Sequence, residues 1–319
     1  MERLDPQLLR ALRAVADTGS ITGAATSLGY SQPAVSQLLQ RAEQRLGHTL
    51  VLRGSRGVTL TEAGRVLADH ALHVQSALTA AQEDLDAVGG LGRGRVRIAG
   101  FPSASSTLVP TVLASMSATV PGVTTSYVEV EPPEALDLLR RGEVDVALTF
   151  TYVGDDLAAD PALVTRPLGR DPLALVTPDD QTDRPGGADH RRPAAAVRPV
   201  AGPVSVDLAS QQHARWIGGC PRCRGHLLAS CASAGFTPDI VLETDNAAAV
   251  VGLVAAGLGV ALLPRLALAT TVIPDGVAVL AVDEDLARRV EVVVSRGAER
   301  VPSVRVTLDA VGAAAHLLD

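Results

Sequence analysis

The sequence contains no lysine, and all 28 of its basic residues are arginine. Alanine, glycine and proline are also abundant, which is the composition typical of a GC-rich genome, so no function follows from the missing lysine. The first residues also lack the basic and apolar pattern of a signal peptide. We therefore expect a cytoplasmic protein.

A hydrophobic run long enough to cross a membrane is missing as well. Residues 247–263 carry no charge over 17 residues, which is close to spanning length, but Gly257 and Gly259 interrupt them and Pro264 follows. A buried helix, a glycine turn and a buried strand explain this segment better. No nucleophile, acid–base pair or phosphate-binding loop stands out, so the sequence offers little support for an enzyme.

Charge is distributed unevenly along the 319 residues, which are enough for two or three domains. A hydrophobic content of 47 % excludes global disorder. The formal net charge is −7, but residues 1–60 carry seven arginines against four acidic residues, so they have a charge of +3 and the remainder −10. A basic N-terminal module on an acidic body indicates one part that faces DNA.

The first 60 residues have the pattern of a winged helix-turn-helix. Apolar spacing predicts a helix over 7–18, a short helix ending at Leu28, and a third helix that begins at the N-cap Ser31 and ends at Gly47. Two short strands, 50–53 and 57–60, are expected to form a wing. This arrangement sets a recognition helix into the major groove of DNA.

A long helix is expected to begin at Thr61 and to carry an apolar stripe over more than six turns. The stripe consists of Val66, Leu67, Ala71, Val74, Ala77, Leu78, Ala81, Leu85 and Val88. Residues 1–60 are committed to a small core of their own, so we expect the helix to pair with a second copy of itself. The glycines of 89–94 predict a hinge.

From Arg95 onward strands and helices alternate, which predicts an open, mainly parallel α/β sheet. The expected strands are 96–101, 123–130, 144–150, 173–176, 214–217, 240–242, 260–263, 277–282 and 290–294. The expected helices are 108–118, 134–141, 222–234, one beginning at Asn246, and 304–317. Residues 178–203 are rich in Pro, Gly, Arg and Asp without periodicity, which predicts a mobile surface loop.

The N-terminal residues resemble the signature of the LysR-type transcriptional regulators. The matching strings are Ala16-Asp17-Thr18-Gly19-Ser20-Ile21-Thr22-Gly23-Ala24-Ala25 and Ser31-Gln32-Pro33-Ala34-Val35-Ser36, continued by Glu43, Leu46-Gly47, Leu50, Arg53, Arg56-Gly57, Leu60-Thr61 and Ala63-Gly64. Later, Gly142-Glu143-Val144-Asp145 and 253–260 resemble landmarks of the family's effector domain. Ala42 and Val51 replace the usual Leu and Phe, which suggests a thinner core in the N-terminal module.

The resemblance covers almost the whole chain and implies an α/β protein of three parts. These are a winged helix-turn-helix DNA-binding domain at 1–60, a linker helix and hinge at 61–91, and a two-lobed effector-binding domain at 92–319 similar to periplasmic binding proteins. Crossovers near Thr165 and Leu268 give lobe I as 92–165 and 269–319, and lobe II as 166–268.

The resemblance also implies a regulator that binds promoter DNA and a small-molecule effector, without a cofactor or a membrane. Double-stranded DNA, a homodimer or homotetramer and RNA polymerase are the expected partners. A binding protein whose N-terminal module only mediates assembly is the alternative, and an enzyme with an added helical domain comes third.

The candidate DNA contacts lie mainly on the third helix and the wing. An amide can donate to and accept from one purine, so Gln32 and Gln37 are expected to read base edges. Hydroxyl groups and wing arginines are expected to meet phosphates. The full set is Thr22, Ser31, Gln32, Pro33, Ser36, Gln37, Arg53 and Arg56.

The candidate effector contacts lie where expected strands end. The 103–106 segment offers hydroxyls and backbone N–H groups at a helix start, although ordinary capping explains these residues nearly as well. The full set is Ser103, Ala104, Ser105, Thr149, Thr151, Gly219, Cys220 and Asn246.

Cys220 and Cys223, with His226 and Cys231 beyond them, have the spacing and residue types of a zinc or redox site. The ligands would share one helix, which a single tetrahedral ion would strain, so no metal is expected. Thiols that pack or line the effector site are favoured, and a redox sensor remains the main alternative.

Overall fold

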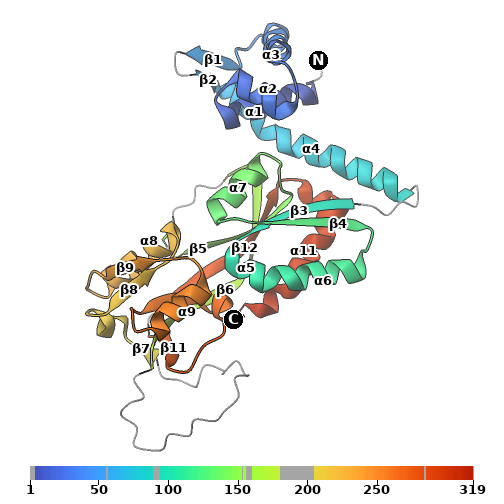
Figure 1. Cartoon of the computed structure of the whole chain (residues 1–319). Helices are drawn as coiled ribbons and strands as arrows, with labels where there is room; N and C mark the ends of the chain where they lie inside the picture. The colour runs from blue at the N-terminus through green and yellow to red at the C-terminus, as the bar shows by residue number, and fades with distance from the viewer. Residues whose placement is uncertain are drawn as a thin grey trace, which may run out of the picture.

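The computed structural model describes residues 4–54, 57–88, 94–152, 154–155, 160–179, 205–283 and 285–318. Figure 1 shows a helical N-terminal part, which we call the head (4–60), one long helix, and a larger α/β part, which we call the body (94–318). Arg56, the hinge residues 89–93 and most of the expected loop lie outside the described residues.

The head contains helices α1 (Pro6–Thr18), α2 (Ile21–Leu28) and α3 (Gln32–Leu46), and the antiparallel strands β1 (Val51–Gly54) and β2 (Gly57–Leu60). The expected boundaries of α3 are confirmed. The Ser31 side chain accepts a hydrogen bond from the Ala34 N–H, and Gly47 ends the helix in the left-handed region at a φ of 71°.

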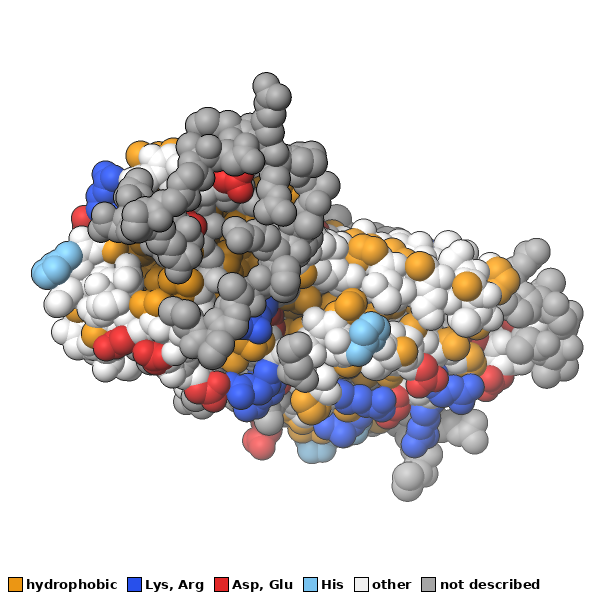
Figure 2. Space-filling model, turned by 90° about the horizontal axis from the view of Figure 1, so that it is seen from below, with side chains coloured by type: hydrophobic (Ala, Val, Ile, Leu, Met, Phe, Trp, Pro, Cys, Tyr) orange, Lys and Arg blue, Asp and Glu red, His pale blue; other side chains and the backbone are white. Residues whose placement is uncertain are grey.

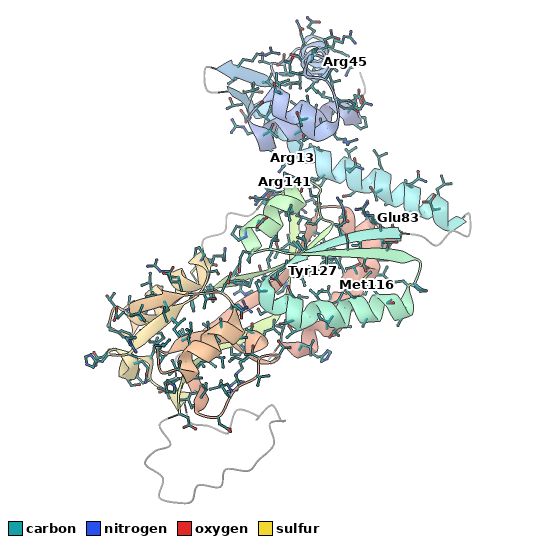
Figure 3. The ribbon with its side chains drawn as sticks, in the orientation of Figure 1. Arg13, Arg45, Glu83, Met116, Tyr127 and Arg141 are labelled. Atoms are coloured by element: carbon teal, nitrogen blue, oxygen red, sulfur yellow. The ribbon has the colours of Figure 1, made fainter. Side chains whose placement is uncertain are left out.

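Helix α4 (Glu62–Val88) connects the head to the body. The expectation that residues 1–60 leave the α4 stripe uncovered is wrong in part, because α1 packs along α4 and Leu67 and Ala71 are covered. Near the other end of α4, the Glu83 carboxylate accepts hydrogen bonds from Ser303 (Figure 3). Leu78 and Leu85 remain 52 % and 64 % exposed.

The main sheet of the body has the strand order β4-β3-β5-β12-β6-β11-β7, and β10 also pairs with β6. Its strands are β3 (Gly94–Gly100), β4 (Val123–Glu129), β5 (Val146–Tyr152), β6 (Leu163–Pro178), β7 (Ser205–Val206), β10 (Ala261–Pro264), β11 (Val277–Val282) and β12 (Ala287–Ser295). A smaller parallel sheet joins β8 (Arg215–Gly218) and β9 (Asp239–Glu243).

The sheet is mixed rather than mainly parallel, which corrects the expectation. Strand β3 runs parallel to β4 and β5, but β12 runs antiparallel to both β5 and β6, and β10 and β11 run antiparallel to β6. The cause is the two-lobed path of the chain. Strand β6 carries the chain from lobe I into lobe II, and β12 follows the return of the chain to lobe I. Strands β6 and β12 are neighbours and therefore run in opposite directions.

The structure also places the changes between lobes later than expected. Strand β6 pairs with β12 up to Pro172 and with β10 and β11 from Leu173 onward. The chain returns between Val282 at the end of β11 and Ala287 at the start of β12. Only 173–176 of β6 were expected, because two prolines and a glycine in 163–172 disguise its first half.

The remaining helices are α5 (Pro102–Ser106), α6 (Leu108–Thr119), α7 (Pro132–Arg140), α8 (Pro221–Ser233), α9 (Ala247–Ala255), α10 (Arg265–Leu268) and α11 (Pro302–Ala314), with 3-10 turns at Leu208–Gln211, Ala298–Arg300 and Ala315–Leu317. Within the described residues, no helix has the length and apolar character that a membrane span requires. On the face seen in Figure 2, basic and acidic side chains alternate along one edge, and hydrophobic groups are scattered elsewhere.

Candidate functional sites

The start of helix α3 presents polar side chains to solvent. Gln32, Pro33 and Gln37 are exposed, and Ser36 is half-buried. The guanidinium of Arg53 on the wing donates a hydrogen bond from Nη2 to the Ser36 hydroxyl over 3.2 Å. The structure therefore brings the helix and the wing together as one continuous polar surface.

A second contact fixes the wing relative to α3. The Glu43 carboxylate accepts hydrogen bonds from the backbone N–H groups of Leu50 and Val51, over 2.7 and 3.1 Å. Ser31 uses its hydroxyl as the helix cap, whereas Thr22 is exposed on the neighbouring helix α2. Local capping and the β1–β2 hairpin thus set the positions of the candidate residues that the structure describes.

A cavity of about 330 Å³ lies in the body, where β5 and β12 face the loop before α8 and the start of α9. Of the eight candidate effector contacts, Ser103, Gly219, Cys220 and Asn246 line it. These residues come from segments far apart in the sequence. The cavity therefore draws on both lobes.

The structure does not place Ala104, Ser105, Thr149 and Thr151 on the cavity lining. Ala104 is fully buried in the core, and the Ser105 hydroxyl is hydrogen-bonded to that of Tyr127 over 2.6 Å. Successive side chains of a strand point to opposite faces of its sheet. Since Phe150 and Tyr152 of β5 line the cavity, Thr149 and Thr151 point away from it.

Arg288 is the residue at the centre of the lobe I wall, and the sequence did not single it out. Its guanidinium is 3 % exposed, binds the Asp171 carboxylate at 2.7 and 2.8 Å, and also donates to the Ser103 hydroxyl. It lies over the rings of Phe101 and Phe150, 4.8 and 4.5 Å from their centres. This cation is therefore fully committed to groups of the protein itself.

The opposite wall carries two thiols at the start of α8. The Cys220 thiol donates to the Cys223 sulfur over a Sγ–Sγ distance of 3.2 Å. The Tyr152 hydroxyl donates to the same Cys223 sulfur over 3.5 Å, and the Tyr152 ring stacks on His226 at 3.9 Å. Strand register pairs Tyr152 with Arg288 across β5 and β12, so a lobe I residue beside Arg288 contacts Cys223 and His226 of the opposite wall.

Burial and neighbouring groups change the protonation of this cluster. Burial and, to a smaller extent, the adjacent Cys220 raise the pKa of Glu131 to about 7, while the Glu131 Oε2 atom has no hydrogen-bond partner. The hydrogen bonds from Cys220 and Tyr152 and the charge of Arg288 outweigh burial and lower the pKa of Cys223 to about 7. Its partner Cys220 holds the proton, so its pKa is raised.

Sequence reasoning missed Glu131, Tyr152 and Arg288, because nothing in their local sequence marks them. Cys223 and His226 were recognised only as parts of a cysteine motif. Within the described part of the chain, no group of three or more Cys, His, Asp and Glu side chains is arranged to hold a metal ion.

Two family models match the chain. The model for the bacterial regulatory helix-turn-helix protein, lysR family, matches residues 6–65, and the LysR substrate binding domain matches residues 89–315. The second match alone spans more than half of the sequence, including every element that forms the cavity.

Named relatives and solved structures agree with these matches. The chain is 29 % identical to the Probable HTH-type transcriptional regulator LrrA of Synechococcus elongatus, over 94 % of both chains. It is 32 % identical to a Probable hydrogen peroxide-inducible genes activator of Streptomyces viridosporus, over 83 % of this chain and 80 % of the relative. Its fold matches a full-length OxyR variant from Pseudomonas aeruginosa with a TM-score of 0.63 at 19 % identity, covering 98 % of this chain and 95 % of that one.

Proposed function

The chain belongs to the LysR family of bacterial transcriptional regulators. We propose that the binding of this chain to promoter DNA is controlled by a small uncharged or cationic molecule that binds in the cavity between the lobes. Family membership answers the question that the sequence left open, because relatives of this chain are named as regulators of transcription rather than as enzymes or assembly proteins.

The commitment of Arg288 carries the proposal about the effector. An anion buried in a protein needs a cation or several donors to replace its water. The Arg288 guanidinium already neutralises Asp171, whereas Glu129, Glu131 and Asp245 all line the cavity. An effector that carries its own negative charge would meet repulsion there, whereas an amine or a neutral hydrogen-bond donor would find acceptors.

The size and walls of the cavity fit a small ligand. A volume of about 330 Å³ lies at the lower end of the range for ligand pockets. Aromatic rings of Phe150 and Tyr152 and the apolar side chain of Leu173 form much of the wall. We therefore expect one ring or a short chain, with its polar group directed at Glu131.

Helix α7 offers a route from the cavity to the head. Glu131, at the N-cap of α7, lines the cavity, and Arg141 follows the last residue of the helix. Burial raises the pKa of Asp17 at the end of α1, and Arg13, which pairs with it at 3.0 Å, and to a smaller extent Arg141 act to lower it; Figure 3 labels both arginines. A shift of α7 on effector binding would therefore reach the DNA-binding head through one rigid element.

On the DNA side, we propose that the exposed start of α3 enters the major groove and that the wing meets the phosphate backbone. In this arrangement Gln32 and Gln37 read bases, and Ser31, Ser36, Thr22 and Arg53 hold phosphates. We further propose that Leu78 and Leu85 of α4 pack against a second copy of the chain, since family members act as oligomers and these two side chains share one exposed face.

A matched set of probes tests the effector proposal. Benzylamine, benzyl alcohol and benzoate have nearly the same size and differ in charge. Calorimetric titration of the full chain should find the amine or the alcohol bound more tightly than benzoate, and Glu131→Gln should weaken the amine most. Tightest binding of benzoate would contradict the proposed effector class.

A further inference from the structure

Two thiols, Cys220 and Cys223, line the cavity wall. We propose that Cys220 and Cys223 form a redox-active dithiol, which is oxidised to a disulfide by exchange with a low-molecular-weight disulfide that enters the cavity. This inference adds a regulatory input to the site assigned under the proposed function, although the thiol chemistry does not itself require an effector.

The two sulfur atoms are already placed for bond formation. Cys220 is the N-cap residue of α8 and Cys223 lies in its first turn, so the helix directs both side chains to the same side. Their Sγ–Sγ distance is 3.2 Å, and a disulfide bond of about 2 Å needs only a small rotation of each side chain. Both residues line the cavity.

The preceding residue allows this arrangement. A Cβ atom at Gly219 would lie 3.0 Å from the Cys223 Cβ, which is tighter than ordinary contact. Glycine at this position therefore lets the chain turn from β8 into α8 while Cys223 stays against Cys220.

The surroundings favour a thiolate on Cys223. Two donors, the Cys220 thiol and the Tyr152 hydroxyl, point at its sulfur, and Arg288 supplies positive charge from β12. The N-terminal end of a 13-residue helix adds a favourable dipole. Both thiols line the cavity, and the lower pKa makes Cys223 the one that attacks an incoming disulfide.

A buried acid lies beside the second thiol. Glu131 comes from lobe I, its Oε2 atom has no hydrogen-bond partner, and Cys220 is close enough to raise its pKa. With a pKa of about 7, this carboxylate can accept the Cys220 proton near neutral pH. Glu131 therefore links the redox state of Cys220 and Cys223 in lobe II to the wall of lobe I and to the start of α7.

The reaction balances in two exchange steps. The Cys223 thiolate attacks a disulfide RSSR, which forms a Cys223–SR mixed disulfide and releases RS⁻. Glu131 then takes the proton of Cys220, and the resulting thiolate attacks the Cys223 sulfur, forming the Cys220–Cys223 bond and releasing a second RS⁻. The two cysteines lose two electrons, which reduce RSSR to two thiols, and the released thiolates take up the protons.

Cys231 provides an internal control. It lies further along α8, is fully buried, and packs in the lobe II core with Trp216 rather than in the cavity. If exposure to the cavity and the short sulfur–sulfur distance determine reactivity, the third cysteine should remain a thiol throughout.

The test uses the reduced full-length chain, with cystamine, a small cationic disulfide, as the probe, followed by alkylation and mass spectrometry. Wild type and Cys231→Ser should each form a Cys220–Cys223 bridge. Cys220→Ser should accumulate cysteamine on Cys223 as a mixed disulfide, whereas Cys223→Ser should react at least about tenfold more slowly than the wild type. Glu131→Gln should keep the first exchange and slow closure of the bridge, a difference that a purely structural role for Glu131 would not produce.

Three results would overturn the inference: no bridge in wild type, a bridge that includes Cys231, or oxidation by a hydroperoxide but not by cystamine. The same samples, tested for binding to the chain's own upstream DNA and to benzylamine, separate this inference from the proposed function. A chain that binds both ligands but forms no Cys220–Cys223 bridge contradicts the dithiol alone.

Discussion

The head and the body use arginine in opposite ways. In the head, Arg53 is exposed at the wing and its only described hydrogen bond is to the Ser36 hydroxyl. In the body, Arg288 is buried against Asp171 and two aromatic rings. A chain without lysine thus uses one cation type for two purposes. The exposed arginine is available to an anionic partner, whereas the buried one is already paired with a carboxylate of the protein.

The largest effect should follow the loss of the buried cation. Arg288→Met leaves the Asp171 carboxylate, 2 % exposed, without its counter-ion, and breaking a buried pair costs about 3–5 kcal/mol of unfolding free energy. Urea denaturation measures this loss. Arg289→Met is the matched control, because Arg289 is the next residue of β12 but is exposed, and it should change stability by less than about 0.5 kcal/mol. Equal losses in both variants would mean that burial does not distinguish the two arginines.

The helix that joins the two regions should be the next most sensitive. If Leu78 packs against a second copy of the chain, Leu78→Glu buries an unpaired charge there, at a cost of several kcal/mol in association. Sedimentation should show a smaller oligomer at the same concentration. Leu78→Met keeps an apolar side chain of similar size at the same position and serves as the control. An unchanged oligomer in Leu78→Glu would contradict the assigned interface.

A smaller effect is expected from the base-reading surface of the head. Gln32→Ala removes an amide proposed to pair with one base, which should cost about 1–3 kcal/mol of DNA binding and relax the base preference at one position. Competition binding with operator variants measures both quantities. Wild-type affinity together with wild-type preference would show that α3 is placed wrongly on the DNA.

The smallest change should come from the exposed arginine. Arg53→Ala removes one phosphate contact, so it should weaken all DNA sequences alike and reduce the slope of log affinity against log salt by about one unit. Its folding stability should stay near that of the wild type, in contrast to Arg288→Met. A salt slope equal to that of wild type would remove Arg53 from the set of phosphate contacts.

The same two regions differ in how far the sequence predicts them. The recognition helix was predicted from Ser31 to Gly47, because caps and apolar spacing are local signals. The cavity was predicted only in part, because Tyr152 and Arg288 meet through the register of β5 and β12, which no local pattern encodes. The first half of β6 was missed for a related reason, since pairing with β12 overrides the prolines of that segment.

For the two cavity thiols, the sequence showed the motif but not its role. The spacing of Cys220 and Cys223 was visible in the sequence, but it fitted packing, redox and metal-binding roles alike. Only the neighbours of the sulfur atoms separate these roles, and those neighbours come from β5, β12 and the residue before α7. The choice therefore depends on tertiary structure rather than on the motif.

Occupation of the cavity should control DNA binding, and titration of a ligand with and without DNA measures this coupling. If the binding of a ligand and the binding of DNA are coupled, DNA must change the affinity for the ligand by the same factor by which the ligand changes the affinity for DNA. This factor is typically about 5–150, which corresponds to a coupling free energy of about 1–3 kcal/mol. The measurement is the Kd of the tightest-binding probe for the full chain, with and without saturating operator DNA. We expect the two Kd values of the probe to differ, and we expect the probe to change the affinity for DNA by the same factor. Equal constants would contradict control through the cavity.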